Sequence, residues 1–107
     1  MFSDTDLIVG VDVHRRTNVT QMMDGQGDVV DSGRCFANNG TGTRQLARHL
    51  ARLTDSGGFA AIHIAAEATN NYWLPFFCQL SQSAQLASWP VELYPFNPRV
   101  VHNFKKA

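Results

Sequence analysis

Two acidic residues stand in the most apolar segments of this sequence. Asp12 lies within the run LIVGVDV at residues 7–13, and Glu67 directly follows the run FAAIHIAA at residues 59–66. A carboxylate in apolar surroundings is unfavourable unless it is paired, hydrogen-bonded or bound to a metal ion. The two acids therefore suit a metal site. Each also fits a structural role, with Asp12 capping a turn and Glu67 solvated before a helix.

A divalent cation would explain both acids if the fold brings them together. Mg²⁺ takes hard oxygen ligands in octahedral geometry and keeps several waters. Two such ions roughly 3.5–4 Å apart can hold the attacking and leaving oxygens of a phosphodiester. Asp12 and Glu67 are therefore candidate ligands of Mg²⁺ or Mn²⁺, and the structural role of each stays open at this point.

The elements that must position these acids begin with three strands. The β-branched run at residues 7–13 is typical of a strand that is buried on both faces. A second strand is expected over residues 17–23 and a third over 28–36, with a tight turn at Asp24-Gly25-Gln26-Gly27 between them. The short connections predict an antiparallel meander.

After the loop at residues 38–42 the apolar spacing becomes that of a helix. Leucines and arginines form two separate stripes, namely Leu46, Leu50 and Leu53 against Arg44, Arg48 and Arg52. This pattern predicts an amphipathic helix over residues 43–54, and Ser56-Gly57-Gly58 ends it. The arginine stripe either faces solvent or contacts nucleic-acid phosphates.

The next strand, over residues 59–66, is expected to run parallel to an earlier strand because the chain must return across the helix. A strand in this position commonly docks beside the first strand, which would bring Asp12 and Glu67 to one edge of the sheet. Beyond it we expect a helix over residues 70–83, a strand over 90–94 and a third helix over 99–106.

Composition narrows the function classes. The 107 residues are 44% hydrophobic and have a formal net charge of +0, which fits one globular domain over residues 1–107 and excludes a polybasic nucleic-acid wrapper. The sequence lacks a membrane-length apolar run and a basic signal-peptide start, so a cytoplasmic location is expected. Cys35 and Cys78 lack metal-ligand spacing, and each is expected to be a small buried side chain.

Three short blocks of the sequence resemble the DEDD-type insertion-sequence transposases, which are relatives of the Piv DNA invertases. The blocks are VGVDVHRRT at residues 9–17, EATNNY at 67–72, and the stretch from VELYPFNPRV to FKKA at 91–107. The resemblance implies an α/β, RNase H-like (RuvC-like) fold with a mixed five-stranded sheet of order 3-2-1-4-5. It also implies that Asp12 and Glu67 are the first D and the E of the acidic tetrad.

The resemblance further implies a DNA transposase or site-specific recombinase, with Mg²⁺-dependent strand cleavage and transfer during transposition. DNA, a structured guide RNA and further copies of the full-length protein are the implied partners, and no membrane is expected. The family's last two aspartates follow the third block and are not among these 107 residues. We therefore expect a part of a longer transposase that is inactive by itself.

Basic residues near the blocks are candidates for nucleic-acid binding. They are His14, Arg15, Arg16, Arg99, Lys105 and Lys106. His14 also fits a partly exposed histidine at a strand end, or a hydrogen-bond partner of Asp12. Thr69 or Asn70 could cap the second helix. Two other functions stay open at this point, an actin-like ATPase or sugar-kinase lobe and a non-catalytic nucleic-acid-binding scaffold.

Overall fold

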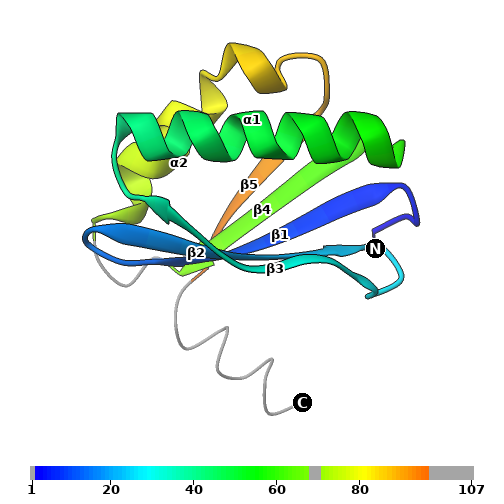
Figure 1. The fold of residues 1–107 in the computed structure, drawn as a ribbon, viewed down its shortest axis with the longest axis horizontal. Coiled ribbons are helices and arrows are strands. Elements are labelled where there is room, and N and C mark those ends of the chain that lie inside the picture. The colour runs from blue at the N-terminus through cyan, green and yellow to red at the C-terminus, as the bar shows by residue number, and fades with distance from the viewer. Residues whose placement is uncertain (1, 68–70, 97–107) are drawn as a thin grey trace.

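A five-stranded sheet forms the centre of the computed structural model, which describes residues 2–67 and 71–96 (Figure 1). The elements in chain order are β1 (Asp6–Val13), β2 (Thr17–Asp24), β3 (Val29–Ala37), α1 (Gly40–Gly57), β4 (Ala61–Glu67), α2 (Trp73–Ser81), the short 3₁₀ helix η1 (Ala84–Leu86) and β5 (Val91–Phe96). The strand order is β3-β2-β1-β4-β5, which confirms the expected order. The antiparallel meander of β1, β2 and β3 and the parallel pairing of β4 with β1 are also confirmed.

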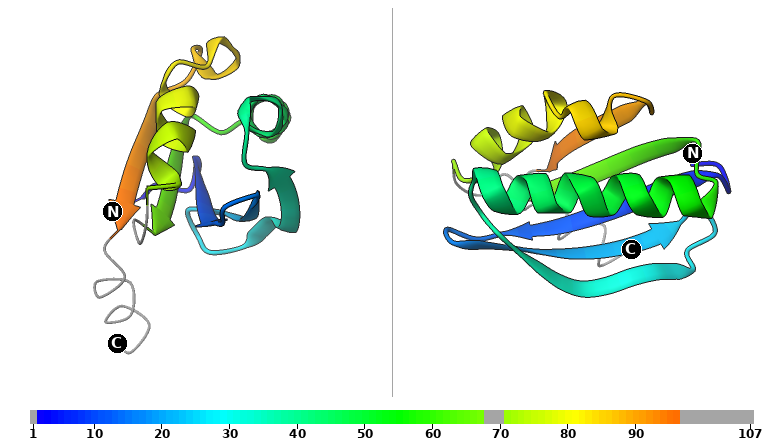
Figure 2. Two further views of the ribbon diagram at one scale, coloured as in Figure 1. Left: turned by 90° about the vertical axis from the view of Figure 1, so that its left-hand side faces the viewer. Right: turned by 45° about the horizontal axis from the view of Figure 1, so that its top comes forward.

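The helices among the described residues, α1 and α2, cover one face of the sheet, and the opposite face is here called the uncovered face (Figure 2). In β1 the buried side chains are Leu7, Val9, Val11 and Val13, and the residues between them face the opposite side. The expectation that this strand is buried on both faces was therefore wrong. Successive strand residues point to opposite faces, and both α1 and α2 pack on the same one.

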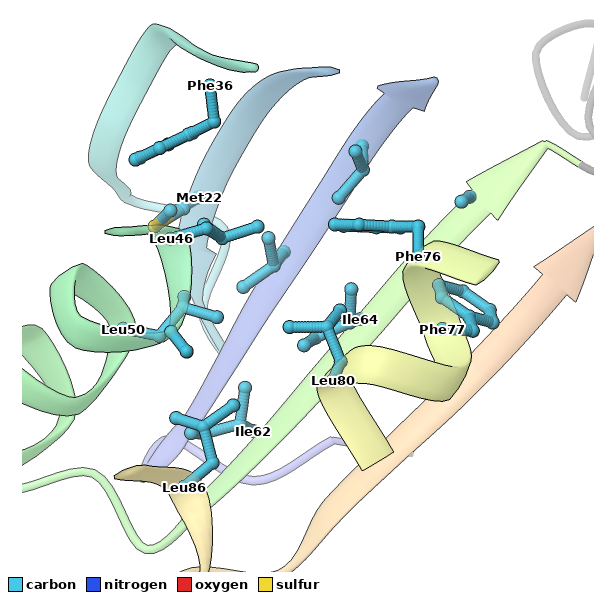
Figure 3. Close-up of a cluster of buried hydrophobic side chains, with 14 of the residues drawn as sticks. Met22, Phe36, Leu46, Leu50, Ile62, Ile64, Phe76, Phe77, Leu80 and Leu86 are labelled. Atoms are coloured by element: carbon cyan, nitrogen blue, oxygen red, sulfur yellow. The ribbon is translucent and has the colours of Figure 1, made fainter. Parts of the chain in front are cut away.

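The core lies between this face and the helices (Figure 3). Leu46 and Leu50 of α1 point toward the sheet, as do Phe76 and Leu80 of α2. Both cysteines lie outside this core: Cys35 and Cys78 are free and exposed, so the prediction of buried cysteines was wrong. The apolar residues that flank both cysteines in the sequence suggested burial. Each cysteine nevertheless lies on the solvent-facing side of its strand or helix.

The helix α1 begins at Gly40, three residues earlier than the leucine pattern indicates. The side chain of Asn39 caps it by accepting a hydrogen bond of 2.8 Å from the N–H of Gly42. A Cβ at position 42 would lie 1.8 Å from the carbonyl oxygen of Ala37, so glycine allows the close approach. Gly58, with φ of 69°, ends the helix in the left-handed conformation.

The second helix is shorter than expected, because α2 runs from Trp73 to Ser81 and its N-terminal cap position is Tyr72. The proposed capping residues Thr69 and Asn70 lie outside the described residues, as does the expected helix over residues 99–106. No helix in the described part of the chain has the length and apolar character to cross a membrane.

The two edge strands of the sheet are both irregular. The pairing of β3 with β2 shifts register twice, between Thr20 and Gln21 and between Met22 and Met23, and Gly33 of β3 has a positive φ of 67°. At the other edge, β5 contains Pro95 opposite Ala66 of β4. These irregularities interrupt the regular row of backbone hydrogen-bonding groups at both edges.

Truncation of Leu50 tests the one-sided core. Leu50 is fully buried between α1 and the sheet, so Leu50→Ala should lower the free energy of unfolding by about 2–5 kcal/mol in urea denaturation. Leu74→Ala is the matched control: Leu74 is also helical but 50% exposed, so its truncation should change stability by less than about 0.5 kcal/mol. Equal losses in both variants would contradict the assigned core.

Candidate metal centre

The parallel pairing of β1 with β4 brings the two predicted acids together. Val11 of β1 lies opposite Ala66 of β4, and the next residues along these strands are Asp12 and Glu67. Val11 and Ala66 are buried under the helices, so side chains one residue further point to the uncovered face. Asp12 and Glu67 therefore share one face and one edge of the sheet.

Both acids line a depression in the uncovered face, here called the open-face hollow, with a volume of about 650 Å³. Gly10 and Ala65 lie opposite each other in its floor, where glycine has no side chain and alanine only a methyl group. A Cβ at Gly10 would meet nothing closer than the carbonyl oxygen of Gln21 at 4.0 Å. The hollow exists because two of the smallest residues lie side by side beneath the acids.

The rim of the open-face hollow includes residues that the sequence did not single out. Gln21 and Val19 of β2 line one side, and Phe96 at the end of β5 lines the other. Phe96 is opposite Glu67 in the strand pairing. For Gln21 and Val19 the only sequence signal was strand alternation, whereas Phe96 lies within the third block of the family resemblance.

His14 contacts Asp12 directly. The Nε2 atom of His14 lies 3.0 Å from Oδ2 of Asp12, and their side chains are 57% and 66% exposed. His14 is thus an exposed histidine just after β1 that lies within ion-pair distance of Asp12.

The connection between β1 and β2 carries the two arginines that were expected near the acids. Arg15 and Arg16 are exposed in this turn, next to Asp12 along the chain. Asn38 fixes the turn: its side-chain amide donates to the carbonyl oxygen of His14 at 2.7 Å, and its backbone N–H donates to that of Arg16 at 2.8 Å. Arg99, Lys105 and Lys106 lie outside the described residues.

A second group of polar side chains crosses the uncovered face beside the hollow. Both ring nitrogens of His63 in β4 make hydrogen bonds. Nε2 lies 3.1 Å from Oδ2 of Asp6, and Nδ1 lies 2.9 Å from the Tyr94 hydroxyl oxygen. The Tyr94 hydroxyl donates a hydrogen bond to Glu92. Both ring nitrogens of His63 are thus hydrogen-bonded.

These contacts lower the pKa of Asp6 and raise the pKa of Tyr94. The backbone N–H of Ser3, 3.0 Å from Oδ2 of Asp6, holds the pKa of this carboxyl below its usual range, and His63 adds to the effect. The hydrogen bond to Glu92 raises the pKa of Tyr94 to about 12, since ionised Tyr94 would face a carboxylate. This polar network is stabilised by hydrogen bonds, so it does not need a metal ion to satisfy its charges.

The open-face hollow fits a hydrated divalent cation. Two carboxylates are enough for Mg²⁺, which usually binds one or two protein carboxylates and completes its shell with water and substrate phosphates. No group of three or more His, Cys, Asp or Glu side chains in residues 2–67 and 71–96 is arranged to enclose a metal ion.

A comparison with protein families finds a match. The model of the IS110-type DEDD transposase family, described as "Transposase", matches residues 9–107. A comparison with curated protein sequences finds no match.

The fold is also similar to that of two crystal structures from Aquifex aeolicus, each with 12% sequence identity and 86% of this chain covered. One is the type II variant of the Ppx/GppA phosphatase, with a TM-score of 0.51 and 36% of its length matched. The other is a Ppx/GppA family member, with a TM-score of 0.49 and 35% matched. The chain spans about a third of the length of these structures, and the likeness concerns the fold alone.

The polar network gives a titration test. In a Tyr72→Phe background, the phenolate absorbance of Tyr94 should titrate with a pKa of about 12. Glu92→Gln should lower it toward the ordinary value of about 10. Because the pKa is raised in the folded state, the contact stabilises the protein below pH about 10, and this stabilisation disappears as pH rises through about 12. An unchanged titration in Glu92→Gln would contradict the assigned contact.

Proposed function

Because the chain belongs to the IS110-type family of DEDD transposases, we propose that Asp12 and Glu67 bind a divalent metal ion used for DNA strand cleavage and transfer during transposition. The observation that carries this proposal is the open-face hollow, where the parallel β1–β4 pairing gives both acids the same face and edge. Bound Mg²⁺ or Mn²⁺ would supply charge stabilisation to a phosphodiester that reacts at this edge.

The chain's own residues orient the ligands and the substrate. His14 holds the Asp12 carboxylate through the 3.0 Å contact, so that the ligand oxygen does not rotate freely. Arg15 and Arg16 contact the phosphates that flank the reacting bond, and the Asn38 hydrogen bonds keep their turn in place. Arg99, Lys105 and Lys106 are further candidates for nucleic-acid contact. DNA and a structured guide RNA are the proposed partners of an oligomeric full-length protein.

Two of the four acids expected for the family are present in these 107 residues. Asp12 and Glu67 each offer carboxylate oxygens, and the remaining ligands of a complete site are the last two aspartates of the tetrad and the substrate. The proposed activity therefore belongs to the longer transposase.

Metal binding can be tested without catalysis. Titration of the ¹⁵N-labelled chain with Mn²⁺ should broaden amide signals around Asp12 and Glu67 first, and Asp12→Asn should weaken binding at least about tenfold. Asp28→Asn is the matched control, because Asp28 is an exposed acid at the far end of β2. If Asp12→Asn leaves the broadening unchanged, the acids are structural and the metal site is refuted.

Activity gives a second test. The purified 107-residue chain should cleave or join DNA in Mg²⁺ no faster than its Asp12→Asn variant, because half of the expected ligand set is missing. The measurement is nicking of supercoiled plasmid followed on gels. Cleavage that Asp12→Asn abolishes would show that these residues form a complete site. Nucleic-acid binding indifferent to both Mg²⁺ and Asp12→Asn would favour the scaffold alternative.

A further inference from the structure

A second depression lies in the helical layer, on the other face of the sheet from the open-face hollow. It is formed where α1 packs against α2 and η1, and its volume is about 390 Å³. We call it the interhelical groove; its lining residues from α1 are Gly40, Thr43, Arg44 and Ala47, and those from the facing segment are Gln79, Gln82, Ser83, Ala84 and Gln85. The volume of the interhelical groove is within the range of small-ligand sites, which is about 300–1,000 Å³.

The chemistry of the interhelical groove favours an anion. Arg44 is the one charged residue among its described lining, and the facing wall offers three glutamine amides and the Ser83 hydroxyl. Neither α2 nor η1 contains a charged residue. The positive end of the α1 dipole also opens here, and the first turn of α1 carries no acid to neutralise it.

Arg44 lies against the start of α1. Its Nη2 atom donates to the Thr41 hydroxyl at 3.2 Å, and a Cβ at Gly40 would come within 3.3 Å of its Nη1. The guanidinium is therefore held beside the first turn, where its charge adds to that of the helix dipole. An exposed hydrogen bond to a neutral hydroxyl leaves most of its donors available for a ligand.

Thr43 supplies an independent observation. Its side chain lines the interhelical groove and is only 4% exposed, and its hydroxyl has no hydrogen-bond partner among the described residues. Buried polar atoms are nearly always hydrogen-bonded, so an unpartnered one calls for a ligand or a water.

The exposed surface next to the groove continues the positive charge. Arg48 and Arg52 follow Arg44 at intervals of four residues along α1, and both are exposed. Each interval advances about 6 Å along the helix axis. A free phosphate ion would contact only the groove. A row of arginines that continues from the groove along α1 suits a ligand with repeated phosphates.

We propose that the interhelical groove binds a backbone phosphate of a nucleic-acid strand, which then follows Arg48 and Arg52 along α1. Arg44 pairs with the phosphate, while Gln82 and Gln85 offer hydrogen bonds to the attached nucleotide. This site is separate from the proposed metal centre. It positions a strand on the helical layer, while the open-face hollow remains accessible from the other side.

Fluorescence anisotropy with the full chain tests the site. The probe is a labelled oligothymidylate of about 12 nucleotides, or its oligouridylate equivalent, in metal-free buffer over a series of salt concentrations. Arg44→Gln should weaken binding about tenfold and reduce the slope of log K against log salt by about 0.7. Gln82→Glu, which adds a negative charge to the exposed wall, should weaken it similarly.

Arg34→Gln is the matched control, since it removes the same charge from an exposed arginine on β3. It should change affinity less than about twofold. If Arg44→Gln weakens binding no more than Arg34→Gln does, the proposal is overturned. The anisotropy is measured without metal, so failure of the groove appears here, whereas failure of the metal centre appears in the Mn²⁺ titration.

Amide chemical shifts locate the ligand and distinguish its source. The oligonucleotide should shift amides at residues 40–47 and 79–85, and loss of these shifts in Arg44→Gln would support the assignment. Shifts confined to the uncovered face of the sheet would refute it. Inorganic phosphate serves as the second probe: if it shifts these amides while the oligonucleotide does not bind, the groove is a site for free phosphate and the nucleic-acid proposal fails.

Discussion

The register of β1 against β4 is the constraint on which the candidate metal centre depends. These strands are parallel, so α1 must carry the chain back across the sheet before β4 can begin at the same edge as β1. The pairing of Val11 with Ala66 then leaves Asp12 and Glu67 next to each other on one face. A slip of β4 by one residue would turn Glu67 into the apolar core and Ala66 out of it.

The one-sided packing of the helices gives the two faces of the sheet different chemistry. The covered face holds the apolar core, whereas the uncovered face carries both acids and the network of Asp6, His63 and Tyr94. Asp12 is therefore solvated, and its charge carries no burial penalty that a metal would have to offset. The small residues Gly10 and Ala65 turn this solvated surface into a concave one.

The strand order and the shared sheet face of Asp12 and Glu67 could be predicted, because strand alternation and the family resemblance are both visible in short stretches of sequence. The packing of α1 and α2 on the same face could not be predicted, since the apolar run at residues 7–13 looks the same whether helices cover one face of the sheet or both. The start of α1 was missed because Gly40 and Gly42 resemble a loop, although the Asn39 cap and the close approach to Ala37 place them in a helix. Contacts such as Asp6 with His63 join residues far apart in the chain and leave no local pattern.

The irregular outer strands limit how copies of this domain can associate. A regular edge strand offers unpaired N–H and C=O groups that can recruit a strand from another molecule, the first step of aggregation. Here the register shifts and Gly33 distort β3, and Pro95 removes an N–H donor from β5. Growth of the sheet by addition of a strand is thus disfavoured at both ends, and copies of the protein have to meet through side chains of their faces and helices.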